Sequence, residues 1–439
     1  MAPGNPNQCA TAARGLGLWS CVALVVASMV GAGVFTTSGF TLADLRSREW
    51  VLAAWAIGGV LALSGALCYA ALARRFPASG GEYEYLRRTV HPLAGALAGW
   101  VSLCAGFTAP LAAAARALDP YMAAAFDVES TGRWCGTAAI AAAGLAHGTH
   151  VRSGAVVQNL VVAVKVALMA TLVVGGGVAI LARGAPPPIP AADGGAAFVP
   201  ALAVSLVWIS FAYSGWNAAV YVAGEVRTPE RTVARALLVG TLLVTALYLG
   251  LNAVFVYADD FAALAGRPEI AAAAAEGLAG PWLRRAVGGL VALALVTSIT
   301  SLVMAGPRVY ARMAEDGVLP GWFAARDARP PRAAITLQCA LALVALWVAR
   351  LEQLMTYVGW TLSVCSALTV LGLCRVRARE GAAAVPVRGW PWLPAFYVIA
   401  VLGIAGFSLA DRPVEGVVGL ATLGAGVGLG WWFLRSRAD

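Results

Sequence analysis

The chain has 439 residues, of which 60% are hydrophobic and only 12% are charged. Soluble domains carry nearer a quarter of charged residues, so this composition excludes an ordinary soluble fold and indicates a membrane protein. The formal net charge is +9, and its basic residues lie in short segments between long apolar runs. That placement fits membrane topology and contact with anionic lipid rather than nucleic-acid binding.

Twelve apolar segments follow one another along the chain, most of them close to the length that crosses a bilayer core. They cover residues 15–40, 50–72, 94–118, 134–148, 153–181, 198–224, 237–257, 286–304, 333–348, 354–374, 390–409 and 414–434. The fourth and ninth are short. We therefore predict an all-α integral membrane protein with twelve transmembrane helices in one domain that spans residues 1–439.

The arginines predict the orientation of these helices. If the tail 1–14 is cytoplasmic, twenty of the thirty arginines fall in inner segments and ten in outer ones. Short cytoplasmic loops usually carry the excess of basic residues. We expect both termini in the cytoplasm and the chain in the plasma (inner) membrane. The first apolar run lacks the pattern of a cleaved signal peptide, so we expect it to remain as a helix.

Two predicted helices are interrupted by glycine near their middle. The first contains SMVGAGVF at 28–35, and the sixth contains ISFAYSGWN at 209–217. Each begins a block of five, which predicts a 5+5 inverted repeat of residues 15–181 and 198–374, followed by two trailing helices at 390–434. We expect helices one and six to be unwound at mid-membrane. The alternative is that these glycines only let neighbouring helices pack closely.

Unwound backbone inside a membrane implies a polar ligand. Each unpaired amide or carbonyl costs several kcal/mol in lipid unless a cavity or ligand satisfies it. The helix that continues from Gly33 starts with free N–H groups and the positive end of its dipole, which attract a carboxylate. The carbonyls ahead of each break attract an ammonium group. One α-amino acid carries both groups.

Four stretches, in order along the chain, resemble a known family. They are SMVGAGVF, GALCYAALARRFPASGGEYEYLRR, FAYSGWNAAVYVAGEVRTPERTVARAL and MAGPRVYARMAEDGVLP. Together they resemble the amino acid–polyamine–organocation permeases, specifically the amino acid permease branch with the leucine-transporter-type fold. The resemblance runs nearly from end to end of the chain.

The resemblance implies roles for residues at both breaks. The amides of Gly31, Ala32 and Gly33 would bind the substrate carboxylate, although Ala32 stands where many members have Ser or Thr. Phe211 would be the aromatic gate, while Tyr213 and Trp216 would be wall or gate. The ammonium group would meet carbonyls ahead of each break and beside Gly215: those of Met29, Val30, Phe211, Ala212 and Ser214.

The only lysine of the chain, Lys165, lies deep in the fifth predicted span. A charged lysine at the bilayer centre costs about 2.5–3.5 kcal/mol, but lysine can lose its proton whereas arginine cannot in practice. The alternative is a side chain that extends to the interface. The resemblance implies that Lys165 replaces the Na⁺ that sodium-coupled relatives bind between helices one and eight, with Ser298 and Ser301 as neighbours.

We therefore predict an amino acid permease that works by alternating access on small neutral L-amino acids. We expect transport to be independent of sodium and to run by proton coupling or by exchange. The alternatives are a polyamine or cationic amino acid antiporter of the same superfamily and a non-transporting nutrient sensor. No enzyme is expected, because the spans supply no converging nucleophile and base. We expect no cofactor, no metal site and no obligate partner subunit; the partners are the amino acid, protons and membrane lipid.

Overall fold

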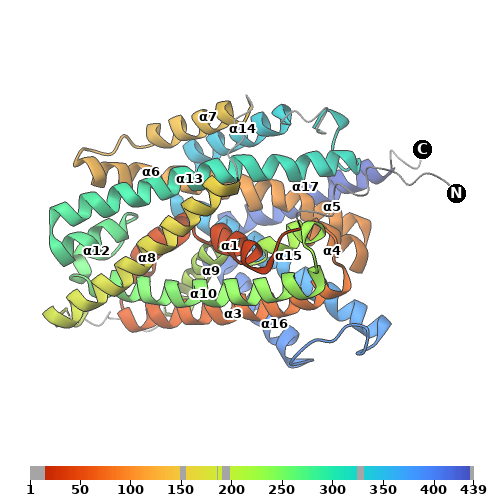
Figure 1. The fold of residues 1–439 in the computed structure, drawn as a ribbon, viewed down its shortest axis with the longest axis horizontal. Helices are drawn as coiled ribbons and strands as arrows, with labels where there is room; N and C mark the ends of the chain where they lie inside the picture. Colours follow the sequence, from red (N-terminus) through yellow and green to blue (C-terminus); the bar gives the residue numbers. More distant parts are fainter. Residues whose placement is uncertain (1–14, 149–154, 185, 190–197, 324–330, 436–439) are drawn as a thin grey trace.

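The computed structural model describes residues 15–148, 155–184, 186–189, 198–323 and 331–435 (Figure 1). The predicted tail 1–14 and the first two residues of the predicted fifth span lie outside these ranges. Within them the chain is helical, with one isolated bridge between Leu16 and Val226. In chain order the helices are α1 (Leu18–Met29), α2 (Ala32–Leu45), α3 (Arg48–Arg75), α4 (Gly81–Thr89), α5 (Pro92–Val101), η2 (Ser102–Thr108), α6 (Ala109–Phe126), α7 (Trp134–Gly148), α8 (Ala155–Arg183), α9 (Phe198–Tyr213), η4 (Ala218–Glu225), α10 (Pro229–Tyr257), α11 (Phe261–Leu264), α12 (Ile270–Ala279), α13 (Pro281–Glu315), η5 (Gly321–Phe323), α14 (Arg332–Val348), α15 (Leu351–Glu380), α16 (Trp392–Asp411) and α17 (Pro413–Arg435).

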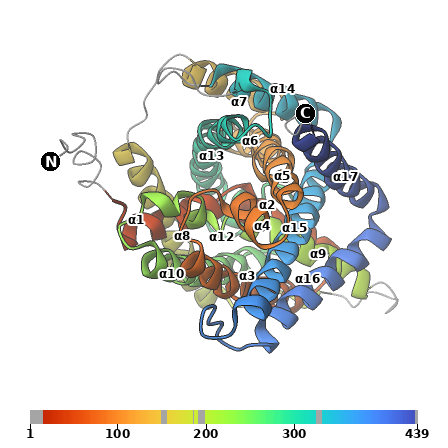
Figure 2. The ribbon, with the colours of Figure 1, turned by 90° about the vertical axis from the view of Figure 1, so that its right-hand side faces the viewer.

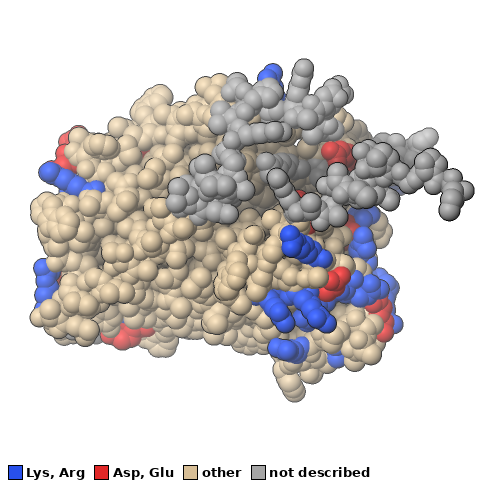
Figure 3. Space-filling view, in the orientation of Figure 1, with Lys and Arg blue, Asp and Glu red and all other residues tan. Residues whose placement is uncertain are grey.

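The described helices confirm an all-α membrane architecture. Nine of them are long and apolar enough to cross a bilayer, or ten if the bent pair α1 and α2 is one span. The predicted fourth and ninth segments correspond to α7 and α14, which have 15 and 17 residues. Charged side chains in Figure 3 gather at the two ends of the helices, whereas the middle of this face is almost free of them.

Several helices extend well beyond the predicted apolar segments. Helix α15 has 30 residues, with Glu352 in its first turn and Arg377 and Arg379 in its last. Acids near a helix N-terminus and bases near its C-terminus favour the helix dipole, so the polar flanks stay helical. The helix ends where Gly381 adopts a φ of +89°, a conformation that glycine reaches at little cost. An apolar run therefore marks the middle of a helix rather than its ends.

Short helices outside the predicted spans were missed. Helix α4 begins after Gly80 at φ +130° and carries Glu82 and Glu84 in its first turn. It lies in the predicted inner loop and is too short and polar to stand out as a span. Helix α12 likewise follows the seventh span. The third predicted span is α5 and α6 joined by a π-helical stretch, Ser102–Thr108.

Most of the long helices run roughly parallel, and the second half of the first broken pair, α2, lies among them (Figure 2). Figure 1 shows α3 and α10 side by side along one flank and α6 and α13 along another, and these pairs pack closely. Viewed along the helices in Figure 2, α2, α12 and α15 lie nearer the middle, with α8, α10, α3 and α13 around them. The segment before α1 pairs with the segment after η4, because Leu16 N donates to Glu225 O at 2.9 Å.

Candidate functional site

The first break separates α1 from α2. Helix α1 ends at Met29, Val30 and Gly31 are extended, and α2 starts at Ala32. The axes of the two helices differ by 42°. No side chain caps the start of α2, so its first N–H groups lack the partners that a continuous helix would give them.

The second break follows α9. The helix ends at Tyr213, and Ser214 N turns back to donate to Phe211 O at 3.0 Å. Gly215 then adopts a φ of +94°, which strains any residue with a Cβ. Ala218 N donates to Gly215 O at 3.0 Å, and the chain continues as the 3₁₀-helix η4. The regular helical hydrogen-bond pattern therefore stops in this segment, as it does between α1 and α2.

The two breaks interlock through glycine. A Cβ on Gly33 would collide with the backbone and Cβ of Ala212, and a Cβ on Gly215 would collide with the backbone of Ser28. Each broken segment thus packs a glycine directly against the backbone of the other. Gly31 differs, because a Cβ there would meet no atom within 4 Å. Close packing explains Gly33 and Gly215, whereas Gly31 faces open space.

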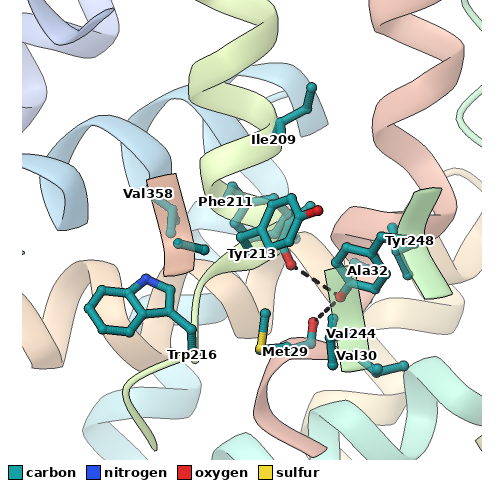
Figure 4. Packing of buried hydrophobic residues seen from close by; sticks show 14 of the residues in the cluster. Met29, Val30, Ala32, Ile209, Phe211, Tyr213, Trp216, Val244, Tyr248 and Val358 are labelled. Atoms are coloured by element: carbon teal, nitrogen blue, oxygen red, sulfur yellow. Dashed lines mark hydrogen bonds between the residues drawn. The ribbon is translucent and has the colours of Figure 1, made fainter. Parts of the chain in front are cut away.

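Tyr248 on α10 joins the two breaks by hydrogen bonds. Its hydroxyl donates to Met29 O at 2.6 Å and lies 3.2 Å from Ala212 O, as the dashed lines in Figure 4 show. In a continuous helix each of these carbonyls would accept from the amide four residues further on. Here the breaks move those amides away from the carbonyls. Tyr248 does not stand out in the sequence, since a lone tyrosine in an apolar helix usually has a packing role.

Both breaks line one cavity of about 1170 Å³. It continues between the helices to Ser79, Gly80, Glu225 and Asp316, which lie in the predicted inner segments. Every predicted site residue contributes to its lining: Met29, Val30, Gly31, Ala32, Gly33, Lys165, Phe211, Ala212, Tyr213, Ser214, Gly215, Trp216, Ser298 and Ser301.

The carbonyls expected around an ammonium group are partly engaged within the protein. Met29 O accepts from the Tyr248 hydroxyl, which also lies 3.2 Å from Ala212 O, and Phe211 O accepts from Ser214 N. A carbonyl has two lone pairs, so each keeps one further acceptor position. These carbonyls therefore lie at the cavity as predicted, but some of them already accept a hydrogen bond from another group of the protein.

The three aromatic residues at the second break have different surroundings. Tyr213 packs between Trp55 and Tyr248, with ring centroids at 5.8 and 5.2 Å, and donates to Trp55 O at 3.1 Å. That network holds it in the wall of the cavity. Trp216 meets the Tyr69 ring edge to face at 4.7 Å. Phe211 lines the cavity with a hydrocarbon ring, which needs no polar partner in order to move.

Lys165 projects from α8 and contacts α13. Its Nζ donates to Ser298 Oγ at 2.9 Å, while Ser298 Oγ in turn donates to Ala294 O at 3.0 Å. The side chain is only 7% exposed. Ser301 lies one turn further along α13 and donates to Thr297 O. The hydrogen bond that the described residues show for Lys165 thus runs to the eighth predicted span rather than to a carbonyl of α1.

Glu82 forms a second polar centre at the inner part of the cavity. It is 7% exposed and accepts hydrogen bonds from Tyr69, Asn217 and Tyr221. Asn217 and Tyr221 belong to the segment that follows the second break, so this carboxylate ties α4 to η4. Nearby, burial is the main cause that raises the pKa of Tyr83 to about 12, so its hydroxyl stays protonated near neutral pH. Asn217 and Tyr221 could not be identified from the sequence as partners of Glu82, because they lie far from it along the chain.

Comparison with known proteins decides the family. A model of the amino acid permease family matches residues 16–416. The chain belongs to the amino acid permease family. The predicted resemblance is confirmed, and the multi-pass membrane architecture follows from the family together with the apolar helices.

Named relatives of this permease are transporters rather than enzymes. The serine/threonine exchanger SteT of Bacillus subtilis is 28% identical over 415 residues, which cover 90% of this chain and 91% of that one. The large neutral amino acids transporter small subunit 2 of Rattus norvegicus is 27% identical and covers 94% and 79%. The b(0,+)-type amino acid transporter 1 of Homo sapiens is 32% identical, but the match spans 54% of this chain and half of that protein.

Among solved structures, a mutant manganese transporter of Eremococcus coleocola is similar to this permease over 95% of each chain. The TM-score is 0.57 and the sequence identity 13%. At that identity the likeness concerns the fold alone.

Proposed function

We propose that this permease carries small neutral L-amino acids by alternating access, independently of sodium, by exchange or with protons. The observation that carries the proposal is that two broken helices interlock inside one cavity, with uncapped N–H groups at Ala32 and Gly33. The amides of residues 31–33 bind the carboxylate there, and the remaining acceptor positions of the carbonyls at residues 29, 30, 211, 212 and 214 take the ammonium group. We infer that both breaks lie at mid-membrane.

The lining of the cavity supports a small substrate. Small residues contribute to the lining, including Gly58, Ala62, Gly106, Ala114 and Gly359. A cationic side chain would need a counter-charge. Of the carboxylates that line the cavity, Glu82 accepts from three neutral donors and Glu84 pairs with Arg87 and Arg88. The other two, Glu225 and Asp316, lie in the inner segments rather than at the breaks. One relative is by name a serine/threonine exchanger, which fits small neutral amino acids. A cationic amino acid or polyamine antiporter is the alternative within the superfamily.

Sodium independence is supported by Lys165. Its ammonium group lies beside Ser298 on α13, in a cavity that Met29 and Val30 also line. A resident cation there takes the place of a sodium ion, since two like charges in a buried site repel strongly. Loss of the lysine proton would weaken its hydrogen bond to Ser298 and so loosen α8 from α13, beside the cavity that the first break lines. Proton coupling and exchange both fit this arrangement.

We also propose twelve membrane spans in a 5+5 inverted repeat of residues 15–181 and 198–374, with two trailing helices at 390–434, in one domain. Helices α7 and α14 would be the fourth and ninth spans, which are short but pack against each other and against α13. Both termini would be cytoplasmic and the membrane the plasma membrane. One relative is by name a small subunit, but the bacterial exchanger is not so named, and we propose that this chain needs no partner subunit.

Counterflow in proteoliposomes tests the proposal. Vesicles are loaded with each of twenty amino acids, and uptake of labelled serine or alanine is measured with and without Na⁺ and with and without a pH gradient. We expect uptake driven by small neutral amino acids and unchanged by Na⁺. Uptake only with arginine, lysine or a polyamine inside would favour the cationic antiporter. Substrate binding without any flux would favour a nutrient sensor.

A further inference from the structure

A basic pocket lies apart from the substrate cavity, where three arginines converge. Arg74 at the end of α3, Arg377 in the last turns of α15 and Arg388 in the α15–α16 connection line a pocket of about 430 Å³. Its other lining residues are uncharged: Ala382, Pro386 and Val387. The guanidinium groups therefore supply all of its charge.

The connection between α15 and α16 is held in place by two of these arginines. Arg74 Nη2 donates to Pro386 O at 3.4 Å, and Arg377 donates to Val385 O. The Arg377 guanidinium also lies over the Trp390 ring, 4.6 Å from its centroid. A guanidinium carries five N–H donors, so both arginines keep donors beyond those that shape the pocket. The pocket is built by tertiary contacts rather than by loosely placed surface arginines.

The charge of this pocket is not balanced by a carboxylate. Glu380 is close in sequence but pairs with Arg75, at 2.6 and 3.2 Å. Within the described ranges, no ion pair joins Arg74, Arg377 or Arg388 to an acid. Clustered cations repel one another unless an anion lies between them, and the planar fork of arginine matches phosphate oxygens in pairs.

The position of the pocket indicates where that anion comes from. Trp390, whose ring lies under the Arg377 guanidinium, is 36% exposed, and Trp392, the first residue of the apolar helix α16, is 80% exposed. Tryptophans are enriched at the boundary between hydrocarbon and headgroups. Figure 3 shows basic side chains gathered toward this end of the molecule. Basic pockets between transmembrane helices bind the headgroups of anionic lipids.

We propose that Arg74, Arg377 and Arg388 bind the phosphate of an anionic phospholipid at the headgroup level. The leaflet, which would be the cytoplasmic one, rests on the topology proposed above. The binding itself does not depend on the substrate or on transport, so failure of either proposal can be told from failure of the other.

Lipid titration followed by native mass spectrometry tests this site. The purified full chain is titrated with phosphatidylglycerol, with phosphatidylcholine of the same acyl chains, and with inorganic phosphate as a competitor. The pocket variant is Arg74→Gln/Arg388→Gln, which leaves Arg377 to hold the connection. The matched control is Arg231→Gln/Arg379→Gln, which removes two exposed arginines of the same end outside the pocket.

Each arginine near the headgroups contributes about 1 kcal/mol, or roughly fivefold in affinity. We expect the pocket variant to bind phosphatidylglycerol about 25-fold more weakly, by the same constant for two arginines, and the control to change much less. Equal losses in both variants, or no preference of the wild type for phosphatidylglycerol, would overturn the site. Displacement of the lipid by millimolar inorganic phosphate would overturn the lipid assignment.

A single variant covers the case in which the double variant does not fold. Arg388 is exposed and donates no hydrogen bond within the described residues, so Arg388→Gln leaves the connection in place. We expect it to weaken phosphatidylglycerol binding about fivefold without a change in melting temperature. Unchanged binding in this variant would contradict the proposal.

Discussion

Replacing Tyr248 with phenylalanine tests whether the two breaks act as one unit. The substitution keeps the ring and removes only the hydroxyl, which donates to Met29 O at 2.6 Å and lies 3.2 Å from Ala212 O. Both carbonyls lie where regular helix ends, and the tyrosine is fully buried. Leaving a buried polar group without its partner costs about 1–3 kcal/mol.

That cost corresponds to roughly fivefold to 150-fold in an equilibrium constant. We expect Tyr248→Phe to lower the melting temperature and to slow amino acid exchange by at least fivefold, because the ends of α1 and α9 are no longer held together. The assays are thermal unfolding in detergent and initial exchange rates in proteoliposomes, normalised to the amount of reconstituted protein.

Tyr310→Phe is the matched control. Tyr310 is equally buried, but its hydroxyl lies 3.5 Å from Leu103 O, away from both breaks. We expect little loss of exchange in this variant. The coupling of the two breaks through Tyr248 would be refuted if the two variants exchanged at the same rate, or if Tyr248→Phe retained wild-type melting and transport.

Four further substitutions test the cavity. Lys165→Ala should abolish uptake while leaving expression intact, measured by reconstituted flux against pH; wild-type uptake with an unchanged pH profile would contradict the coupling role. Gly33→Ala should destabilise the protein by about 1–3 kcal/mol through overpacking. The Gly31→Ala variant should keep the wild-type melting temperature but have a higher KM for the larger of its substrates. Equal melting temperatures for both variants would contradict the close packing of Gly33 against Ala212. Glu82→Gln should lower the stability of the protein by about 1.5–3 kcal/mol, since hydrogen bonds to a charged group are the stronger ones. A wild-type melting temperature and exchange rate would show that the link between α4 and η4 is dispensable.

Much of the fold was predictable because lipid imposes simple demands on sequence. A helix that crosses a bilayer must be long and apolar, so the number and order of the apolar runs could be found without a structure. The ends of the helices could not, because polar flanks stay helical on the strength of capping and dipole effects that the apolar pattern does not contain. Helix α15 is an example, since it is predicted over 354–374 and runs from Leu351 to Glu380.

The residues of the candidate site were predictable to a similar degree. The glycines at 31, 33 and 215 and the single lysine stand out in the sequence because each is unusual in an apolar helix, and all of them line the cavity. Their partners were not predictable. Tyr248, Asn217 and Tyr221 look like ordinary residues of a membrane helix until the fold brings them to a free carbonyl or a buried carboxylate.

The sequence by itself determined that this chain is a helical membrane protein, where its helices would be interrupted and that its one lysine lies deep in an apolar segment. Those properties depend on composition and on neighbours along the chain. Only the tertiary structure decided that Gly33 lies against Ala212, that the Tyr248 hydroxyl joins Met29 to Ala212, and that three arginines share a pocket. Such contacts form between residues far apart in sequence, and the free energy of each depends on distances that no local pattern records.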